Sequence, residues 1–292
     1  MPDRALARRL AADAALFAVA TSWGATFPLA KRLLTELPPF FYLALRFALA
    51  AAVLVTVAGR KLPQLGRRGL VDGAILGTLL AAGYGLQTLG LRTASATVSA
   101  FLTGMSVVMV PLLGMAFGRR PSLMAWIGVG AALLGLALLT LQPAHGQRFG
   151  VGEILVLGCA LAFAVHIVYQ SRVAQNHPAL PLGLVQITTV ALLTLVFSIP
   201  EPKPWGLSPY AMWALTFMAV VCTAVAFSVQ AWAQRFTPAT HVGLLFAFEP
   251  VAAALFAWAW LGERLSGGQW LGAGLIFAGI VLAEWTPRPA SA

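Results

Sequence analysis

The residues of this sequence that could do chemistry stand out because they interrupt apolar runs. Glu249 and Pro250 lie inside the apolar stretch from Ala239 to Leu261, where Glu249 is the eleventh residue. As one helix this stretch would be about 34 Å long. If it crosses a membrane, a carboxylate at its middle must face a polar interior, and Pro250 leaves the carbonyl of Phe246 without its helical donor. The pair predicts either a transport or gating group, proton coupling included, or a hydrogen-bonded structural lock.

Arg46 is the only basic residue well inside an apolar run of this sequence. Its depth in its own run differs from that of Glu249 by roughly 6 Å at helical rise, which an arginine side chain can span. Two interpretations stay open: a structural pair with Glu249 or with helix-end carbonyls, and direct binding of a substrate carboxylate.

Other polar and aromatic side chains inside apolar runs are candidates for the wall of a cavity. Ser99, Thr103 and Ser106 recur at positions i, i+4 and i+7 and so form a polar stripe on one helix face; its alternative role is hydrogen bonding between helices. His166 could relay protons or be a hydrogen-bonded core histidine. The further candidates are Trp23, Tyr84, Gln87, Gln230 and Trp232, and the predicted helix bends are at Pro28, Pro111 and Pro250.

The composition places these residues in a membrane protein. Of 292 residues, 60% are hydrophobic and 10% are charged, whereas soluble domains carry about a quarter charged residues. The net charge of +10 is scattered in ones and twos, which favours a membrane surface over nucleic acid as partner. Cys159 and Cys222 lie in separate apolar runs without metal-ligand spacing, so they are expected to be buried thiols.

The fold class expected is an all-α integral membrane protein with ten transmembrane helices. A signal peptide is not expected, because the apolar character continues past Ala18-Val19-Ala20, and the first span is retained. The ten apolar segments are roughly Asp13 to Leu29, Pro39 to Val57, Gly69 to Gly90, Ser95 to Phe117, Ser122 to Leu141, Gly150 to Tyr169, Leu180 to Ile199, Pro209 to Gln234, Ala239 to Leu261 and Gly267 to Trp285.

The two halves of the chain repeat each other. Gly118, Arg120, Ser122, Trp126, Gly128, Gly130 and Gly135 each meet an identical residue 144 positions later. Five spans per repeat make the second half enter the membrane from the opposite side, so residues 1–145 and 146–292 are predicted to be inverted repeats around a central cavity. Gly73 with Gly77, and Gly268 with Gly272, have the spacing of close helix packing.

The distribution of Lys and Arg predicts the orientation. Of the 19, 12 fall on the side that holds the N-terminus, 6 on the other side, and Arg46 inside a span. The positive-inside rule therefore puts both termini in the cytoplasm, as expected for a multi-pass protein of a bacterial inner membrane.

The sequence lacks the motifs of several other classes. It has no G-x-S-x-G, no H-E-x-x-H and no Walker loop, so no catalytic residue, metal site or cofactor is predicted. A channel filter or ring of charge is also missing. A secondary transporter that works by alternating access is the class that remains, with a non-transporting membrane scaffold as the competing one.

The motifs together resemble the drug/metabolite transporter superfamily and, within it, the ten-span bacterial exporters of the EamA type. The motifs that carry the resemblance are WGATFPLAKRL from Trp23, LRF from Leu45, TASATVSAFL from Thr93, FEPV from Phe248 and GERLSGGQWLGAGLIFAGIVL from Gly262. The resemblance implies two inverted five-span repeats and export of small metabolites without ATP. The sequence looks closest to an aromatic amino-acid exporter of that family. It departs from internal symmetry, because Ser106 stands over Glu249 and Pro111 lies about four residues deeper than the match of Pro250.

The buried charges limit the cargo. A phosphorylated cargo would need several cations, and the sequence offers one buried Arg and no buried Lys. A neutral or zwitterionic metabolite is therefore predicted, such as an aromatic or other apolar amino acid or a related drug. The alternative is a sugar-phosphate or nucleotide-sugar carrier of the same superfamily. The expected partners are this cargo and the bilayer, and the chain is expected to be a monomer.

Overall fold

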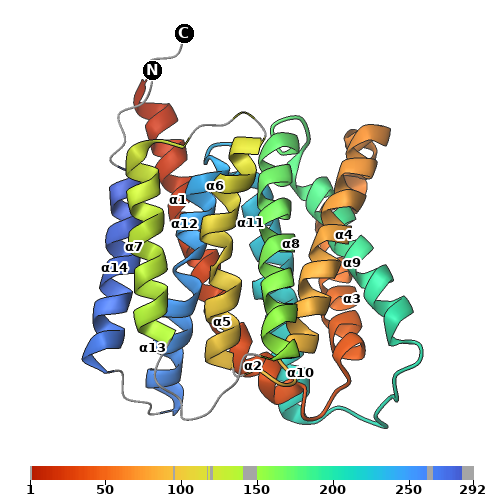
Figure 1. Cartoon of the computed structure of the whole chain (residues 1–292). Coiled ribbons are helices and arrows are strands. Elements are labelled where there is room, and N and C mark those ends of the chain that lie inside the picture. The colour runs from red at the N-terminus through yellow and green to blue at the C-terminus, as the bar shows by residue number, and fades with distance from the viewer. Residues whose placement is uncertain are drawn as a thin grey trace.

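The protein is a bundle of helices in which α1 (Pro2–Gly24) begins and α14 (Gly267–Glu284) ends at the same end of the bundle, called here the end that carries the termini (Figure 1). The computed structural model describes residues 2–94, 96–116, 118, 121–140, 150–261 and 266–284. Over these residues the regular elements are α-helices with one 3-10 segment and one π segment, and there is no strand. The predicted all-α class is confirmed.

The elements follow one another with short connections. The first half of the chain contains α1 (Pro2–Gly24), α2 (Thr26–Leu33), α3 (Pro39–Ala58), the 3-10 segment η1 (Gly59–Leu65), α4 (Gly66–Gly90), α5 (Ala96–Gly104), α6 (Ser106–Ala116) and α7 (Leu123–Thr140). The second half contains α8 (Val151–Val173), α9 (Ala179–Ser198), α10 (Pro209–Ala219), the π segment η2 (Val220–Val225), α11 (Ala226–Ala233), α12 (Ala239–Phe246), α13 (Glu249–Leu261) and α14 (Gly267–Glu284).

Seven segments in the described part of the chain are long and apolar enough to cross a membrane. They are Leu6–Leu33, Pro39–Gly90, Val98–Ala116, Val151–Val173, Ala179–Ser198, Pro209–Ala233 and Ala239–Phe256. The segment Pro39–Gly90 contains two predicted spans, and the predicted fifth and tenth spans are represented by the shorter apolar helices Leu123–Leu138 and Gly267–Leu282. The membrane class is confirmed, and the count of ten stays a prediction.

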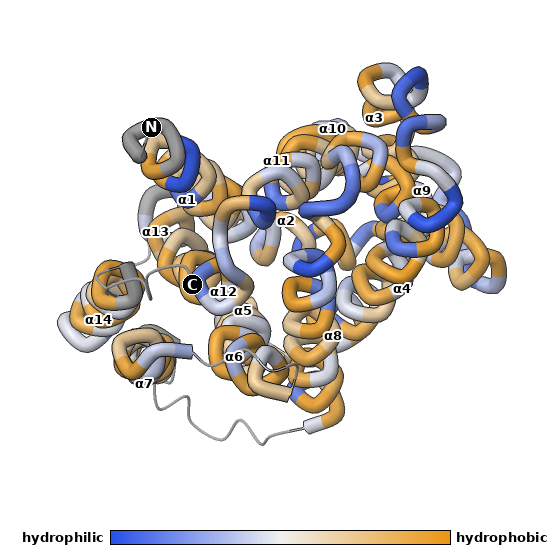
Figure 2. Tube along the Cα trace, turned by 90° about the horizontal axis from the view of Figure 1, so that it is seen from above, coloured by the Kyte–Doolittle hydropathy of each residue, from blue (hydrophilic) through white to orange (hydrophobic). Residues whose placement is uncertain are grey.

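The outer faces of the helices are apolar, as lipid contact requires. On α9, Leu192, Leu195, Val196 and Phe197 are each more than half exposed, and Figure 2 shows orange, hydrophobic residues around the rim of the bundle. Soluble monomers rarely expose contiguous apolar surface of this kind. The buried polar residues, in contrast, lie inside the bundle.

Three helical passes are interrupted within the bundle. Ala25 separates α1 from α2, which contains Pro28, and Met105 separates α5 from α6, which contains Pro111. Pro28 cannot donate to the carbonyl of Gly24, at the first break, whereas Pro111 lies inside α6, beyond the second break, and does not account for it. Whether these three prolines also act in gating stays a prediction.

The third interruption corrects a prediction. The run from Ala239 to Leu261 was expected to be one bent helix, but α12 ends at Phe246 and α13 begins at Glu249. Pro250 is therefore in the first turn of a new helix, where its missing N–H costs nothing.

Helices from opposite halves of the chain pack side by side. The four most extensive pairings are α7 with α14, α3 with α9, α4 with α8, and α4 with α9. In addition, α1 packs against α11 and α13. Figure 1 shows α7 beside α14 and α4 beside α9, and in each pair the two helices differ widely in colour although they are adjacent in space. The apolar core therefore lies between the halves rather than within each.

Small residues allow the closest of these approaches. A Cβ added at Gly135 of α7 would lie 2.5 Å from the carbonyl oxygen of Gly272 on α14, and one added at Gly279 would lie 2.6 Å from that of Gly128. The two contacts are reciprocal, because both pairs of positions are related by the 144-residue repeat.

The other glycines predicted to pack give a mixed result. Both Gly73 and Gly77 face α9: Gly73 lies against Val185, and Gly77 lies against Gln186 and Thr189. Gly268 faces open space apart from Ser266, so the prediction of a packing contact there is wrong.

We expect Gly135→Ala to lower the free energy of unfolding by about 1 to 3 kcal/mol, because the new methyl group overpacks against the backbone of α14. The measurement is thermal or denaturant unfolding of the purified protein in detergent.

The matched control is Gly130→Ala on the same helix, where an added Cβ has nothing within 4 Å. Alanine should be neutral or stabilising there by up to about 1 kcal/mol. Equal effects of both substitutions would contradict the close α7–α14 contact.

Candidate functional site

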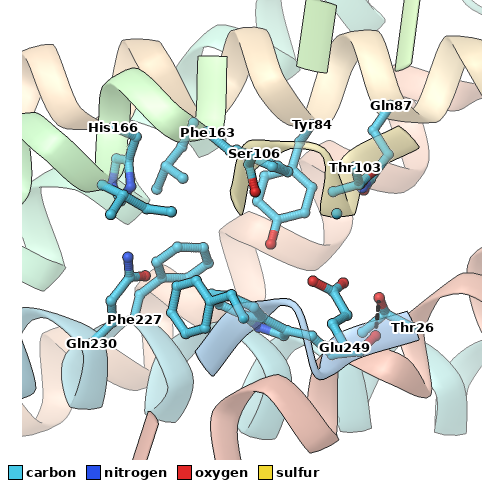
Figure 3. A pocket seen from close by; sticks show the side chains of 15 residues that line it. Thr26, Tyr84, Gln87, Thr103, Ser106, Phe163, His166, Phe227, Gln230 and Glu249 are labelled. Atoms are coloured by element: carbon cyan, nitrogen blue, oxygen red, sulfur yellow. Dashed lines mark hydrogen bonds between the residues drawn. The ribbon is translucent and has the colours of Figure 1, made fainter. Parts of the chain in front are cut away.

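A central cavity of about 560 Å³ lies where the interrupted helices meet. Its walls come from both halves of the chain, and Figure 3 shows most of the side chains facing each other across it. The lining residues are Trp23, Thr26, Leu80, Tyr84, Gln87, Thr103, Gly104, Ser106, Phe163, His166, Ile167, Phe227, Gln230, Phe246 and Glu249.

Eight of the eleven residues predicted to line a cavity surround this one: Trp23, Tyr84, Gln87, Thr103, Ser106, His166, Gln230 and Glu249. The structure places three elsewhere. Arg46 lies behind the cavity wall, Ser99 is fully buried, and Trp232 lines a second, separate cavity. The polar stripe of Ser99, Thr103 and Ser106 therefore reaches the cavity through its last two members.

Glu249 directs its carboxylate into the cavity, toward the side that carries Tyr84 and Thr103 (Figure 3). It is the first residue of α13. Among the residues that the structure describes, no hydrogen bond or ion pair to this carboxylate is found. The interpretation as a hydrogen-bonded lock thus lacks a partner here, and the carboxylate is free to meet a ligand.

Arg46 is anchored by protein groups on the far side of the wall. It is only 2% exposed. Its Nε donates to Thr223 Oγ1 at 2.9 Å, its Nη1 to the hydroxyl of Tyr42 at 3.2 Å and its Nη2 to the carbonyl of Cys222 at 3.4 Å. The guanidinium also lies 5.0 Å from the ring centre of Tyr84. Of the two interpretations left open, this geometry matches the structural one, through a main-chain carbonyl and not through an ion pair with Glu249. Binding of a substrate carboxylate by Arg46 stays a prediction.

The π segment η2 explains why that carbonyl is available. A π turn displaces the regular helical pairing, and such turns are frequent at functional sites. The carbonyl of Cys222 accepts a second hydrogen bond, 2.8 Å long, from Trp23 Nε1, and Thr223 Oγ1 donates to Met218 O at 2.8 Å. Arg46 on α3 and Trp23 on α1 are thereby tied to the same turn of the second half.

Aromatic rings form most of the apolar wall. Trp23 lies 5.3 Å from Phe227 and 4.9 Å from Phe246, and Tyr84 lies 5.2 Å from Phe163, as distances between ring centres. These tilted and edge-to-face pairs are the arrangements that rings prefer. They give the cavity an apolar, aromatic lining on both of its sides.

A seam of buried amides leads from the cavity toward the end of the bundle that carries the termini. His166 is 3.0 Å from Gln186, and Gln230 donates to Gln234 at 3.0 Å. Gln170, one helical turn beyond His166, is completely buried, and neither atom of its amide meets a partner in the described residues. Buried amides of this kind cost about 1 to 3 kcal/mol each unless water or a ligand satisfies them. His166 is both a hydrogen-bonded core histidine and a cavity residue.

Several lining residues had no signal in the sequence. Phe163, Phe227 and Phe246 are apolar residues among apolar residues, and only their position in the bundle reveals them. Thr26 could have been found, because it belongs to the motif that starts at Trp23.

Over the described ranges, no three His, Cys, Asp or Glu side chains gather closely enough to hold a metal ion. Cys159 and Cys222 are buried and do not form a disulfide. The chemistry available in the cavity is therefore binding, through one carboxylate, hydroxyl and amide groups and aromatic faces.

The family model described as the EamA-like transporter family matches this sequence in two separate segments, residues 10–141 and 150–285. Together they cover nearly the whole chain. The expected resemblance to this family is confirmed, and the finer likeness to an aromatic amino-acid exporter stays a prediction.

Several curated proteins are similar over most of their length. An uncharacterized transporter of Archaeoglobus fulgidus is 30% identical over 282 residues, which are 95% of this chain and 87% of that protein. The uncharacterized inner membrane transporter YedA of Escherichia coli K12 is 27% identical, with 92% and 89% covered. The uncharacterized transporter YoaV of Bacillus subtilis is 25% identical, with 93% and 96% covered.

A solved structure titled "Crystal structure of protein" has the same fold, with a TM-score of 0.78 and 21% sequence identity. The alignment covers 94% of this chain and 96% of that one. At this identity the likeness speaks for the fold alone.

We expect Arg46→Gln and Thr223→Val to be coupled in stability by about 1 to 3 kcal/mol, because they remove the two partners of one buried, charged hydrogen bond. The measurement is a double-mutant cycle on the free energy of unfolding in detergent.

The control cycle combines Arg46→Gln with Thr56→Val, an exposed threonine ten residues further along α3, which lies about 15 Å away. These two substitutions should be additive. A coupling of zero between Arg46 and Thr223 would contradict the anchoring role of the π segment.

Proposed function

We propose that this chain, which belongs to the EamA-like transporter family, is a secondary transporter that exports a small zwitterionic or neutral metabolite. Amino acids with an aromatic or other apolar side chain, and related drugs, are the proposed cargo. The observation that carries this proposal is the central cavity, in which the side chain of Glu249, without a hydrogen-bond partner in the described residues, points toward Tyr84 and Thr103 and shares the space with aromatic rings. The chain is a multi-pass membrane protein, like the inner membrane transporter YedA to which it is similar.

The cavity has groups suited to each part of an amino acid. Its lining combines one acidic side chain, hydroxyl and amide groups and aromatic rings. The carboxylate of Glu249 can receive an ammonium group, and the rings of Trp23, Phe227 and Phe246 can receive an apolar body. The hydroxyl groups of Thr26 and Ser106 and the amide of Gln87 remain for polar atoms of the cargo.

The alternative of a phosphorylated cargo is disfavoured by charge. No Arg or Lys is among the lining residues, and the one acidic residue there offers a phosphate no positive charge. Arg46 is near but gives three donors to protein acceptors. Direct binding of a cargo carboxylate by Arg46 would therefore require these hydrogen bonds to break.

We propose the architecture of ten spans in two inverted five-helix repeats, residues 1–145 and 146–292. The two separate matches of one family model support it. The helix pairings support it as well. If α1 corresponds to α8, α3 to α9, α4 to α11 and α7 to α14, then the contacts α4–α8 and α1–α11 are equivalent, and α3–α9 and α7–α14 each join a helix to its own counterpart. α7 and α14 have 18 residues each, which give about 27 Å, close to the hydrocarbon thickness of about 30 Å.

Alternating access has candidate contacts at both ends of the cavity. At the end that carries the termini, Asp72 of α4 accepts from Tyr169 of α8 at 2.7 Å and contacts His177 at 2.7 Å, and Thr237 donates to Asp13 at 2.6 Å. Each contact joins the two halves. An opening at this end would have to break them.

The opposite end is joined in a similar way. Glu201 accepts from the backbone N–H groups of Phe40 and Phe41 at 3.1 and 2.7 Å, and Ser208 donates to Glu36 at 2.5 Å. Glu201 thus satisfies the free donors at the start of α3. Alternate rupture of these two sets of contacts would expose the cavity to one side at a time.

For the orientation, we expect both termini to face the cytoplasm, because 12 of the 19 Lys and Arg are on that side. Single cysteines at Gln64 and Trp205, which are exposed at opposite ends of the bundle, are tested in a variant that lacks Cys159 and Cys222. A membrane-impermeant reagent applied to intact cells should label the cysteine at position 205 and leave that at 64 unlabelled. The reverse pattern would contradict the orientation.

For the function, we expect Glu249→Ala to reduce counterflow of an aromatic amino acid in liposomes at least tenfold, because loss of a charged hydrogen bond costs about 1.5 to 3 kcal/mol. Glu249→Gln should slow both counterflow and accumulation driven by a pH gradient, since it keeps the shape and loses the charge. A panel of amino acids, their amides and a phosphorylated sugar identifies the cargo class.

The control variant is Glu153→Gln, which removes a carboxylate at the start of α8, outside the cavity and outside the contacts at its two ends. Glutamine can keep the hydrogen bond to the backbone N–H of Gly150, so this variant should transport like the wild type. Wild-type counterflow by Glu249→Ala would refute the role of Glu249. The absence of saturable uptake for every cargo would point to the scaffold, and saturable uptake of the phosphorylated sugar alone would point to the alternative carrier.

A further inference from the structure

A second cavity, of about 920 Å³, opens at the end of the bundle that carries the termini. One side is formed by η1 of the first half, and the other side by two segments of the second half, the start of α9 and the end of α11. We call it the η1 groove. Its lining residues are Lys61, Gln64, Pro178, Ala179, Leu180, Pro181, Ser228, Val229, Trp232 and Arg235. None of them lines the central cavity, so the η1 groove is a separate site.

The polar groups of the η1 groove are suited to an anion. Lys61 and Arg235 are both exposed, and neither side chain forms an ion pair or hydrogen bond with a residue in the described part of the chain. No Asp or Glu is among the lining residues. The first turn of α9, which begins at Ala179, adds the positive end of a 20-residue helix. Two cations and a helix N-terminus therefore face one open space without a counter-charge.

The remaining wall of the η1 groove is apolar. Leu180, Val229 and the partly buried ring of Trp232 line it, and Trp232 packs edge to face on Phe236 at 5.6 Å. Its indole Nε1 has no acceptor in the described residues. An occupant must therefore combine a negative group with an apolar body.

We propose that the η1 groove binds an anionic phospholipid, with the phosphate between Lys61 and Arg235 and the glycerol and upper acyl chain against Leu180, Val229 and Trp232. Basic pockets between helices at the cytoplasmic surface are where anionic headgroups bind, and Trp with Lys or Arg is typical of the membrane interface. Figure 2 looks onto this end, where blue, hydrophilic residues are gathered around η1 beside the orange helix faces.

The bound lipid would join the two halves of the chain. Lys61 belongs to η1, between α3 and α4, whereas Arg235 follows α11. A phosphate held by both cations links these segments at the same end as the Asp72–His177 contact. The proposal requires the termini to face the anionic cytoplasmic leaflet and is independent of the cargo.

The test uses the purified full-length chain in mild detergent, with phosphatidylglycerol and phosphatidylcholine added at equal concentration. Bound lipid is counted by native mass spectrometry, and the midpoint of thermal unfolding is measured in parallel. We expect phosphatidylglycerol to bind and to raise the midpoint, and phosphatidylcholine to do neither. The double variant Lys61→Gln/Arg235→Gln should bind phosphatidylglycerol roughly 30-fold more weakly, since each cation contributes to headgroup affinity.

The matched control is Arg60→Gln/Arg67→Gln, which removes the same charge from the same end without touching the η1 groove. Its affinity for phosphatidylglycerol should stay within about threefold of the wild-type affinity, because only the long-range electrostatic attraction is reduced. A second variant, Trp232→Ala, should weaken lipid binding while both cations stay in place.

Three outcomes would overturn the proposal: equal binding of phosphatidylcholine, equal loss in the control pair, and displacement of phosphatidylglycerol by millimolar inorganic phosphate, which would identify a site for small anions. All variants are first compared with the wild type by size-exclusion elution and unfolding midpoint. A chain that binds phosphatidylglycerol but gives no counterflow would refute the transport proposal and leave this one standing.

Discussion

The absence of water from the bilayer core is the constraint on which the rest of this structure depends. Backbone groups and charges there must be satisfied within the protein, so irregular segments are tolerable only where they face the interior. The breaks at Ala25, at Met105 and between Phe246 and Glu249, and the π segment Val220–Val225, all adjoin the central cavity or its wall. The cavity is polar because these interruptions converge on it, and the outer faces of the same helices can stay apolar.

Much of the candidate site could be predicted from sequence, because polar residues in apolar runs have few places to go. Glu249, Tyr84 and Gln230 are costly toward lipid, and they do face one cavity. The same reasoning failed for Trp232, since an indole is comfortable both in a core and at an interface. It could not find Phe163 or Phe246, whose types are equally suited to lipid, core and cavity.

The fold was predictable to the level of helices and their order, and less so in its backbone detail. The duplicated glycines around Gly135 and Gly279 predicted a repeat, and in space they form one reciprocal contact. The sequence predicted a bend at Pro250 and not the separation into α12 and α13. A proline shows which helical hydrogen bond is lost, but not how many residues the interruption will span. The π segment contains no proline or glycine, so its position had no signal in the sequence at all.

The two buried charges near the cavity are held in different ways, and the difference has a consequence for the proposed cargo. Arg46 is fixed by three acceptors and by the face of Tyr84, so its positive charge stays behind the wall. Glu249 has no partner in the described residues and lies at the break between two helices. A zwitterion can neutralise such a pair without joining it, with its ammonium group on the carboxylate and its own carboxylate on the side of the arginine. A cargo with a single charge leaves one end of this field uncompensated, so the arrangement favours the zwitterion by electrostatics and leaves the aromatic wall to select the side chain.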